Sequence, residues 1–102
     1  MPLNFTVTEN EIYTFVEMEI NNPEGVLDPS DLAQIKAPSV PGHKGVIISG
    51  RCPVWVYSML THEYHPTAWV ACYDPRKGGG VVTSRHTPNA PAIGSVVPLP
   101  KD

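Results

Sequence analysis

The chain has 102 residues, 41% of them apolar, and this length allows one domain with a single small core. Ten acidic residues against seven lysines and arginines give a net charge of −3. That balance argues against sequence-independent binding of duplex DNA, because such proteins carry a large basic excess. The sequence has no apolar run as long as a membrane span, and its start lacks the basic and apolar segments of a signal peptide. We therefore expect a cytoplasmic protein with no membrane partner, and a homodimer, because a domain this small buries little surface alone.

The N-terminal third predicts a β-hairpin followed by a short helix. Apolar and polar residues alternate over Asn4–Val7 and Ile12–Ile20, with a polar, turn-like link between them. Further on, Asp28 has the side chain of a helix N-cap and Pro29 suits the first helical position. This helix must be short, because Pro38 follows soon after.

The middle of the chain predicts a βαβ unit. Gly45–Gly50 is an unbroken aliphatic run, as in a strand that is covered on both faces. Pro53 then opens a helix that runs to about Glu63, and Thr67–Tyr73 is a second buried strand. Two strands joined in this way should be parallel, with a right-handed crossover.

The C-terminal part predicts two further strands. Gly80–Ser84 follows a glycine turn and is expected to return antiparallel to the strand before it, and Ile93–Val97 is expected to form a short edge strand. The proline-rich segment Pro98–Asp102 is expected to be a disordered tail or the end of a linker. The predicted fold is therefore α/β (α+β). It is a small mixed sheet with an N-terminal hairpin, a short helix and one βαβ unit, in a single domain over residues 1–97.

Polar residues follow both buried strands. In Ser49-Gly50-Arg51 the hydroxyl and the guanidinium suit a phosphate, and the glycine lets a ligand approach the backbone; the alternative is an ordinary turn with a solvated arginine. Asp74 lies beside Arg76, where its carboxylate can bind a metal, act as a base or orient a histidine, although Asp-Pro also commonly starts a plain turn. Because the carboxyl ends of parallel strands meet at one edge of a sheet, we expect both groups there.

Histidines gather at the opposite edge of the predicted sheet. His62 and His65 are three residues apart where the helix ends. This spacing can place two imidazoles on one metal ion, but a helix C-terminus also favours protonated histidine. Lys44 precedes the first buried strand and His86 follows the antiparallel strand, so both belong at this edge. The basic and imidazole groups therefore divide between two edges, and we expect a single site only where edges of two copies meet.

Three stretches together resemble a known family. They are KGVIISGRCPVW, HEYHPTAWVACYDPR and VVTSRH, within Lys44–His86. They are similar to the CRISPR-associated ring nucleases of type III systems, the third Csx family, described as manganese-dependent RNA deadenylation nucleases and as degraders of cyclic tetra-adenylate. The resemblance implies a small homodimer distantly like the domains that sense cyclic oligoadenylate. It also implies that dimers stack head to tail around the cyclic RNA.

The resemblance also implies roles for individual residues. The family's catalytic residues match His65, Asp74 and Arg76, and its manganese ligands are expected at His65 and Asp74. Its ligand-binding residues match Lys44, Ser49, Gly50, Arg51 and His86. The implied activity is cleavage of cyclic tetra-adenylate to short linear oligoadenylates. The alternatives are a sensor module that binds cyclic oligoadenylate without cleaving it, a 3′-end RNA nuclease with adenine preference, and a structural dimer without chemistry.

Overall fold

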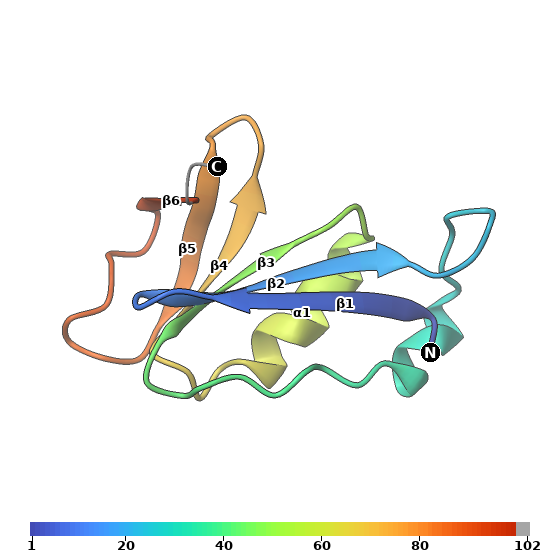
Figure 1. Cartoon of the computed structure of the whole chain (residues 1–102), viewed down its shortest axis with the longest axis horizontal. Helices are drawn as coiled ribbons and strands as arrows, with labels where there is room; N and C mark the ends of the chain where they lie inside the picture. The colour runs from blue at the N-terminus through green and yellow to red at the C-terminus, as the bar shows by residue number, and fades with distance from the viewer. Residues whose placement is uncertain (100–102) are drawn as a thin grey trace.

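A six-stranded mixed sheet in the order β1-β2-β3-β4-β5-β6 forms the frame of the protein (Figure 1). The computed structural model describes residues 1–99. Strands β2, β3 and β4 are parallel neighbours, and the remaining pairs are antiparallel. The elements are β1 (Leu3–Glu9), β2 (Tyr13–Ile20), the 3-10 helix η1 (Pro29–Gln34), β3 (Gly45–Ser49), α1 (Val54–Glu63), β4 (Trp69–Asp74), β5 (Gly79–Arg85) and β6 (Val96–Pro98). The predicted mixed α/β class is confirmed.

The predicted N-terminal hairpin is confirmed as β1 and β2. Its turn is held by the Asn10 side chain, whose Oδ1 accepts hydrogen bonds from the backbone N–H groups of Ile12 and Tyr13, both at 2.8 Å. This geometry is an Asx turn, in which a side-chain oxygen takes the place of a backbone acceptor. The second strand therefore begins at Tyr13, one residue later than the alternating pattern predicted.

The predicted βαβ unit is also confirmed. Strands β3 and β4 run parallel, with Val46 opposite Val70, and α1 connects them. The predicted helix near Asp28 is present as η1, with the Ser30 N–H donating to Asp28 Oδ2 at 3.1 Å. The sequence did not predict that β2 would lie parallel to β3. The long connection through η1 makes this possible, because it carries the chain back to the starting edge of the sheet.

Helix α1 covers one face of the sheet, and Figure 1 shows it behind β1 and β2. Val56 and Leu60 on its inner side are fully buried, as their spacing predicted. Met59 and Trp55 pack at the margin of the same core. The buried residues of this face are Leu3, Val16, Met18, Leu27, Ile35, Val46, Ile48, Val56, Leu60, Tyr64 and Val70.

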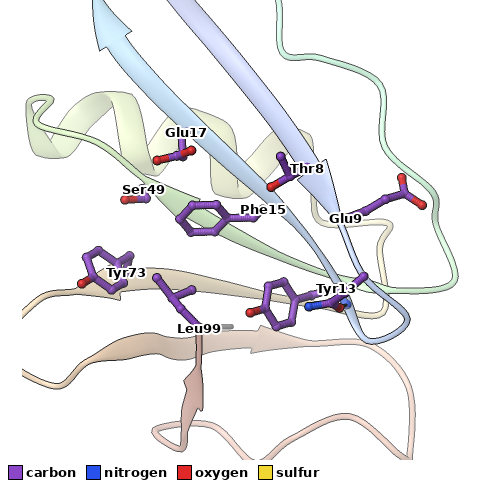
Figure 2. Close-up of a pocket in the computed structure, with 9 residues that line it drawn as sticks. Thr8, Glu9, Tyr13, Phe15, Glu17, Ser49, Tyr73 and Leu99 are labelled. Atoms are coloured by element: carbon purple, nitrogen blue, oxygen red, sulfur yellow. Dashed lines mark hydrogen bonds between the residues drawn. The ribbon is translucent and has the colours of Figure 1, made fainter. Parts of the chain in front are cut away.

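Within residues 1–99, no helix covers the other face of the sheet, and this face is hollowed. Alternate residues of β2 point to it, beginning with Tyr13, whose ring meets Trp69 edge to face at a centroid separation of 6.2 Å. A cavity of about 520 Å³ lies on this face. Figure 2 shows side chains from β1, β2, β3 and β4 around it, together with Leu99.

The C-terminal segment differs from the prediction. Gly94 adopts a φ of +87°, and its N–H donates to the Val82 carbonyl, so the chain turns where the sequence predicted an edge strand over Ile93–Val97. The last strand is Val96–Pro98 instead. Pro98 accepts a hydrogen bond from the Tyr13 hydroxyl at 3.2 Å, and Leu99 packs on the open face. The rest of the predicted tail, residues 100–102, lies outside the described residues.

Within residues 1–99, no helix is long and apolar enough to cross a membrane.

The Thr14 hydroxyl is expected to lower the stability of the folded protein. Its side chain is fully buried, and its Oγ1 has no hydrogen-bond partner among the described residues. Replacing Thr14 with valine keeps the shape and removes the unpaired hydroxyl, so the free energy of unfolding should rise by about 1 kcal/mol. In a domain this size the melting temperature should rise by roughly 4–8 °C, measurable by circular dichroism.

The matched control for Thr14→Val is Thr67→Val. The Thr67 side chain is also buried, but its Oγ1 lies 2.7 Å from the Tyr64 carbonyl. That substitution should lower the melting temperature, because it removes the hydroxyl's hydrogen bond and leaves the carbonyl with only the Thr67 N–H as donor. A Thr14→Val variant that melts at or below the wild-type temperature would contradict the account of Thr14.

Candidate functional site

The predicted site residues lie at two opposite edges of the sheet. The C-terminal edge, where β3 and β4 end, carries the Ser49-Gly50-Arg51 turn and the Asp74-Pro75-Arg76 turn. The N-terminal edge, where the same strands begin, carries Lys44, His65 and His86. This division was predicted from strand directions, and the parallel pairing of β3 with β4 and the antiparallel pairing of β5 produce it.

The Ser49-Gly50-Arg51 turn is rigidly held by its neighbours. Gly50 has a φ of +147°, and a Cβ atom there would lie 2.3 Å from the Met18 carbonyl oxygen, so only glycine fits. The Gly50 carbonyl accepts a hydrogen bond from the Tyr57 hydroxyl at 2.6 Å. Arg51 is exposed, and its guanidinium makes no hydrogen bond to other residues in the described part of the chain. The turn therefore offers a fixed backbone and a free cation to a ligand.

Tyr57 is a positioning residue that the sequence did not reveal, because a tyrosine in the middle of a helix carries no signal of what its hydroxyl contacts. Burial, together with the nearby Cys72 and Cys52 thiols, raises its pKa to about 12. The hydroxyl therefore remains a donor to the Gly50 carbonyl at all physiological pH values.

Replacing Tyr57 with phenylalanine should lower the free energy of unfolding by about 1 kcal/mol, because the Gly50 carbonyl loses the hydroxyl donor and keeps only the Cys52 N–H. The difference in the free energy of unfolding between wild type and Tyr57→Phe should disappear at alkaline pH. A tyrosine whose folded pKa is raised contributes stability that is present below the unfolded value of about 10 and is lost as the pH rises toward the folded value of about 12. Urea unfolding at pH 7 and pH 11 measures both effects. An equal difference between wild type and variant at the two pH values would contradict this account.

Asp74 and Arg76 form a self-contained turn. Asp74 Oδ1 accepts from the Arg76 backbone N–H at 2.9 Å, and the guanidinium contacts both carboxylate oxygens at 3.4 Å. These hydrogen bonds, the side-chain ones first, lower the pKa of Asp74. The carboxyl group is therefore ionised at neutral pH and cannot act as an acid. The Arg76 side chain is 87% exposed and remains available to a ligand.

His65 and His86 meet at the N-terminal edge. Their ring centroids lie 4.4 Å apart with the planes at 77°. His65 reaches this position through the tight turn after α1, and the His86 N–H donates to the Ala68 carbonyl at 2.9 Å. Both side chains are exposed, so two imidazoles face solvent side by side.

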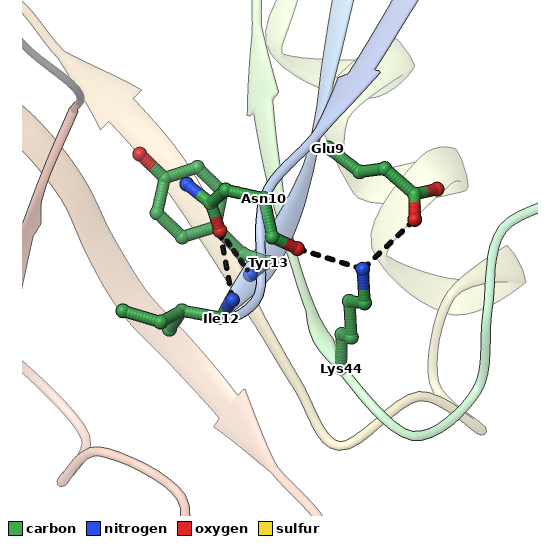
Figure 3. A network of polar contacts seen from close by, with 5 residues as sticks. All are labelled: Glu9, Asn10, Ile12, Tyr13 and Lys44. Atoms are coloured by element: carbon green, nitrogen blue, oxygen red, sulfur yellow. Dashed lines mark hydrogen bonds and ion pairs between the residues drawn. The ribbon is translucent and has the colours of Figure 1, made fainter.

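Lys44 has internal partners, which bears on its predicted role in ligand binding. Its Nζ donates to Glu9 Oε1 at 2.8 Å and to the Asn10 carbonyl at 2.7 Å (Figure 3). The side chain is only 12% exposed. Lys44 therefore ties the β1–β2 turn to the start of β3, and its charge is already paired.

A single copy of the chain does not bring His65 and Asp74 together. They precede and end β4, and at the rise of a strand β4 alone separates them by about 16 Å. Ligands of one manganese ion must lie within about 5 Å of each other. Residues 1–99 contain no cluster of three histidine, cysteine or acidic side chains that could hold a metal ion. The predicted pair therefore does not fit a metal ion within one copy.

Comparison with known proteins places the chain in a family. A family model described as "CRISPR-associated protein (Cas_csx3)" matches residues 20–98. The chain belongs to this CRISPR-associated family. An uncharacterized protein of Aquifex aeolicus (strain VF5) is similar to this chain, with 39% identity over 92 residues that cover 86% of the chain and 79% of the relative. The range that the family model matches runs from the end of β2 to the end of β6 and includes both edges.

Proposed function

We propose that this protein is a ring nuclease that binds cyclic tetra-adenylate and cleaves it to short linear oligoadenylates. Membership of a CRISPR-associated family supports an antiviral role. The observation that carries the proposal is the division of the candidate groups between two edges. Exposed arginines occupy one edge and two neighbouring imidazoles the other, which suits a ligand held between two copies.

In this proposal the C-terminal edge binds the ring through its phosphates. Arg51 and Ser49 hold phosphate oxygens, since a guanidinium and a hydroxyl both donate to them. Arg76, oriented by Asp74, stabilises the charge that develops on the phosphorus-bound oxygens in the transition state. These groups come from the ends of neighbouring parallel strands, so they would act together on one face of the ring.

The N-terminal edge of a second copy supplies proton transfer. An imidazole is the side chain whose ordinary pKa suits proton transfer near neutral pH. We assign this role to His65 and assign His86, its neighbour at 4.4 Å, to ligand binding. The ring would then lie between the C-terminal edge of one copy and the N-terminal edge of the next, in dimers stacked head to tail.

Manganese is part of the proposal only across two copies. His65 of one copy and Asp74 of the next would hold the ion, which would supply a positive charge beside the reacting phosphate. Every step assigned above involves only side chains of the protein. If the two residues hold the ion, activity in EDTA should fall below activity in manganese. Equal activity in the two conditions would show that they do not hold it.

The test is incubation of the protein with cyclic tetra-adenylate, with products separated by chromatography. The proposal predicts linear oligoadenylates that form in proportion to enzyme. A linear oligoadenylate with a free 3′ end is the comparison substrate, because faster loss of that substrate would identify a 3′-end nuclease instead. Unchanged cyclic tetra-adenylate after prolonged incubation would contradict the proposed activity.

A non-catalytic sensor is the second candidate, and one observation favours it. The Asp74 carboxylate is engaged by Arg76, so in a single copy it acts as a structural partner. A binding module needs only the cations of the C-terminal edge. Tight binding of cyclic tetra-adenylate without any product would support the sensor over the nuclease.

A further inference from the structure

The cavity on the open face has a lining that neither edge of the sheet explains. Glu17 and Ser49 are opposite each other in the register of β2 and β3, and Tyr73 continues the row on β4. The next row places Phe15 opposite Ile47. Four of these side chains line the cavity: Phe15, Glu17, Ser49 and Tyr73 (Figure 2).

The hollow exists because small residues lie between large ones. Ser49 separates Glu17 from Tyr73, and Ala71 continues the Phe15 row. Gly80 of β5 packs closely against two residues of the same face, since a Cβ atom there would lie 3.0 Å from the Ile47 side chain and 3.1 Å from that of Ala71. Small side chains flanked by aromatic rings leave a space of about 520 Å³, within the usual range for a small-molecule site.

The chemistry of the lining selects against phosphate. Among residues 1–99, no lysine or arginine lines the cavity. Lys44 donates hydrogen bonds to Glu9 and the Asn10 carbonyl, two residues of the lining, so its charge is already paired. The lining instead offers aromatic faces, four side chains with hydroxyl groups and the exposed carboxylate of Glu17. Its other carboxylate, Glu9, is paired with Lys44. Aromatic rings stack on flat heterocycles, and a carboxylate accepts hydrogen bonds from amino groups.

We propose that this cavity binds a nucleobase through stacking on Phe15 and Tyr73, with the Glu17 carboxylate accepting a hydrogen bond from the exocyclic amino group. The identity of the base rests on the proposed function, which makes it an adenine of cyclic oligoadenylate. Ser49 joins the cavity to the C-terminal edge, because Arg51 follows it by two residues in the same turn. The base is thus recognised on the open face, and its phosphate at the neighbouring edge.

Binding of free nucleosides tests the proposal without any cleavage. Adenosine and inosine differ at the exocyclic position, where inosine carries an oxygen that repels a carboxylate. Titration followed by nuclear magnetic resonance should give saturable shifts at Phe15, Glu17 and Tyr73, with a dissociation constant on the order of 0.1–1 mM for adenosine. Inosine should bind about tenfold more weakly. Equal binding of the two nucleosides, or shifts confined to other residues, would overturn the proposal.

Glu17→Gln sharpens the test, because the glutamine amide can donate to the inosine oxygen. The preference for adenosine should shrink by about tenfold or reverse. The matched control is Glu19→Gln, the same substitution at the next outward-facing position of β2, outside this cavity. It should leave the preference unchanged. A Glu17→Gln variant that keeps the wild-type preference would refute the role of the carboxylate.

Failure of this inference differs from failure of the proposed function. Cleavage of cyclic tetra-adenylate by a protein that does not bind adenosine would overturn the cavity assignment and leave the nuclease standing. Adenosine binding with the predicted shifts, by a protein that leaves the cyclic ligand intact, would support the cavity assignment and overturn the nuclease.

Discussion

Replacing Gly45 with alanine is expected to destabilise the protein by roughly 3–5 kcal/mol, a large part of the total stability of a small domain. A Cβ atom at this position would lie 1.8 Å from the Trp69 ring, which crosses the backbone of β3 there. Trp69 is buried, and its ring packs against Tyr13, so it has no free space to move into. The variant should be largely unfolded at 37 °C by circular dichroism.

Two further variants make the Gly45 prediction specific. Gly42→Ala is the matched control, because a Cβ atom there meets nothing within 4 Å, and it should be neutral or slightly stabilising. In a Trp69→Val background the added methyl of Gly45→Ala meets a smaller side chain, so its cost should fall by at least half. The same cost in both backgrounds would show that the contact with Trp69 is not its cause.

Replacing Arg51 with alanine is expected to weaken binding of cyclic tetra-adenylate by about 10- to 100-fold, because a charge-assisted hydrogen bond to phosphate contributes about 1.5–3 kcal/mol. The side chain is exposed, so stability should stay within about 0.5 kcal/mol of wild type. Isothermal titration calorimetry measures the affinity, and urea unfolding measures the stability.

Two comparisons distinguish a specific contact between Arg51 and phosphate from a general effect of positive charge on binding. Lys36→Ala removes another exposed positive charge, outside both edges of the sheet, and should leave the affinity within about twofold of wild type. Arg51→Lys should restore part of the affinity, because lysine keeps the charge but loses the forked geometry of the guanidinium. Equal losses for Arg51→Ala and Lys36→Ala would contradict a specific phosphate contact at Arg51.

Local patterns in the sequence predicted most of the elements correctly. The alternation in the hairpin, the Asp28 cap and the aliphatic run of β3 each depend on neighbours in the chain, and each was found near its predicted bounds. The two-edge division also followed from the sequence, because strand direction alone decides at which end a residue emerges. Turn geometry was less predictable, as the shift of the last strand to Val96–Pro98 illustrates.

Features that depend on distant contacts were not predictable. The sequence gives no sign that Lys44 contacts Glu9, 35 positions away, or that the Tyr57 hydroxyl reaches the Gly50 carbonyl. The open-face cavity was missed for the same reason. Phe15 and Tyr73 lie on strands far apart in the chain, and only the register of the sheet brings them around one hollow.

The central claim is that the C-terminal edge of one copy acts with the N-terminal edge of another. Mixing two impaired variants tests it most directly, at a concentration of cyclic tetra-adenylate too low for Arg51→Ala to bind. Arg51→Ala damages only the first edge and His65→Ala only the second, so in an equal mixture some interfaces join two intact edges. The mixture should recover about a quarter of wild-type cleavage of cyclic tetra-adenylate, if the copies associate at random. A mixture of His65→Ala with His86→Ala, both at the N-terminal edge, should stay inactive. If the first mixture is no more active than its two components, the site does not form between copies.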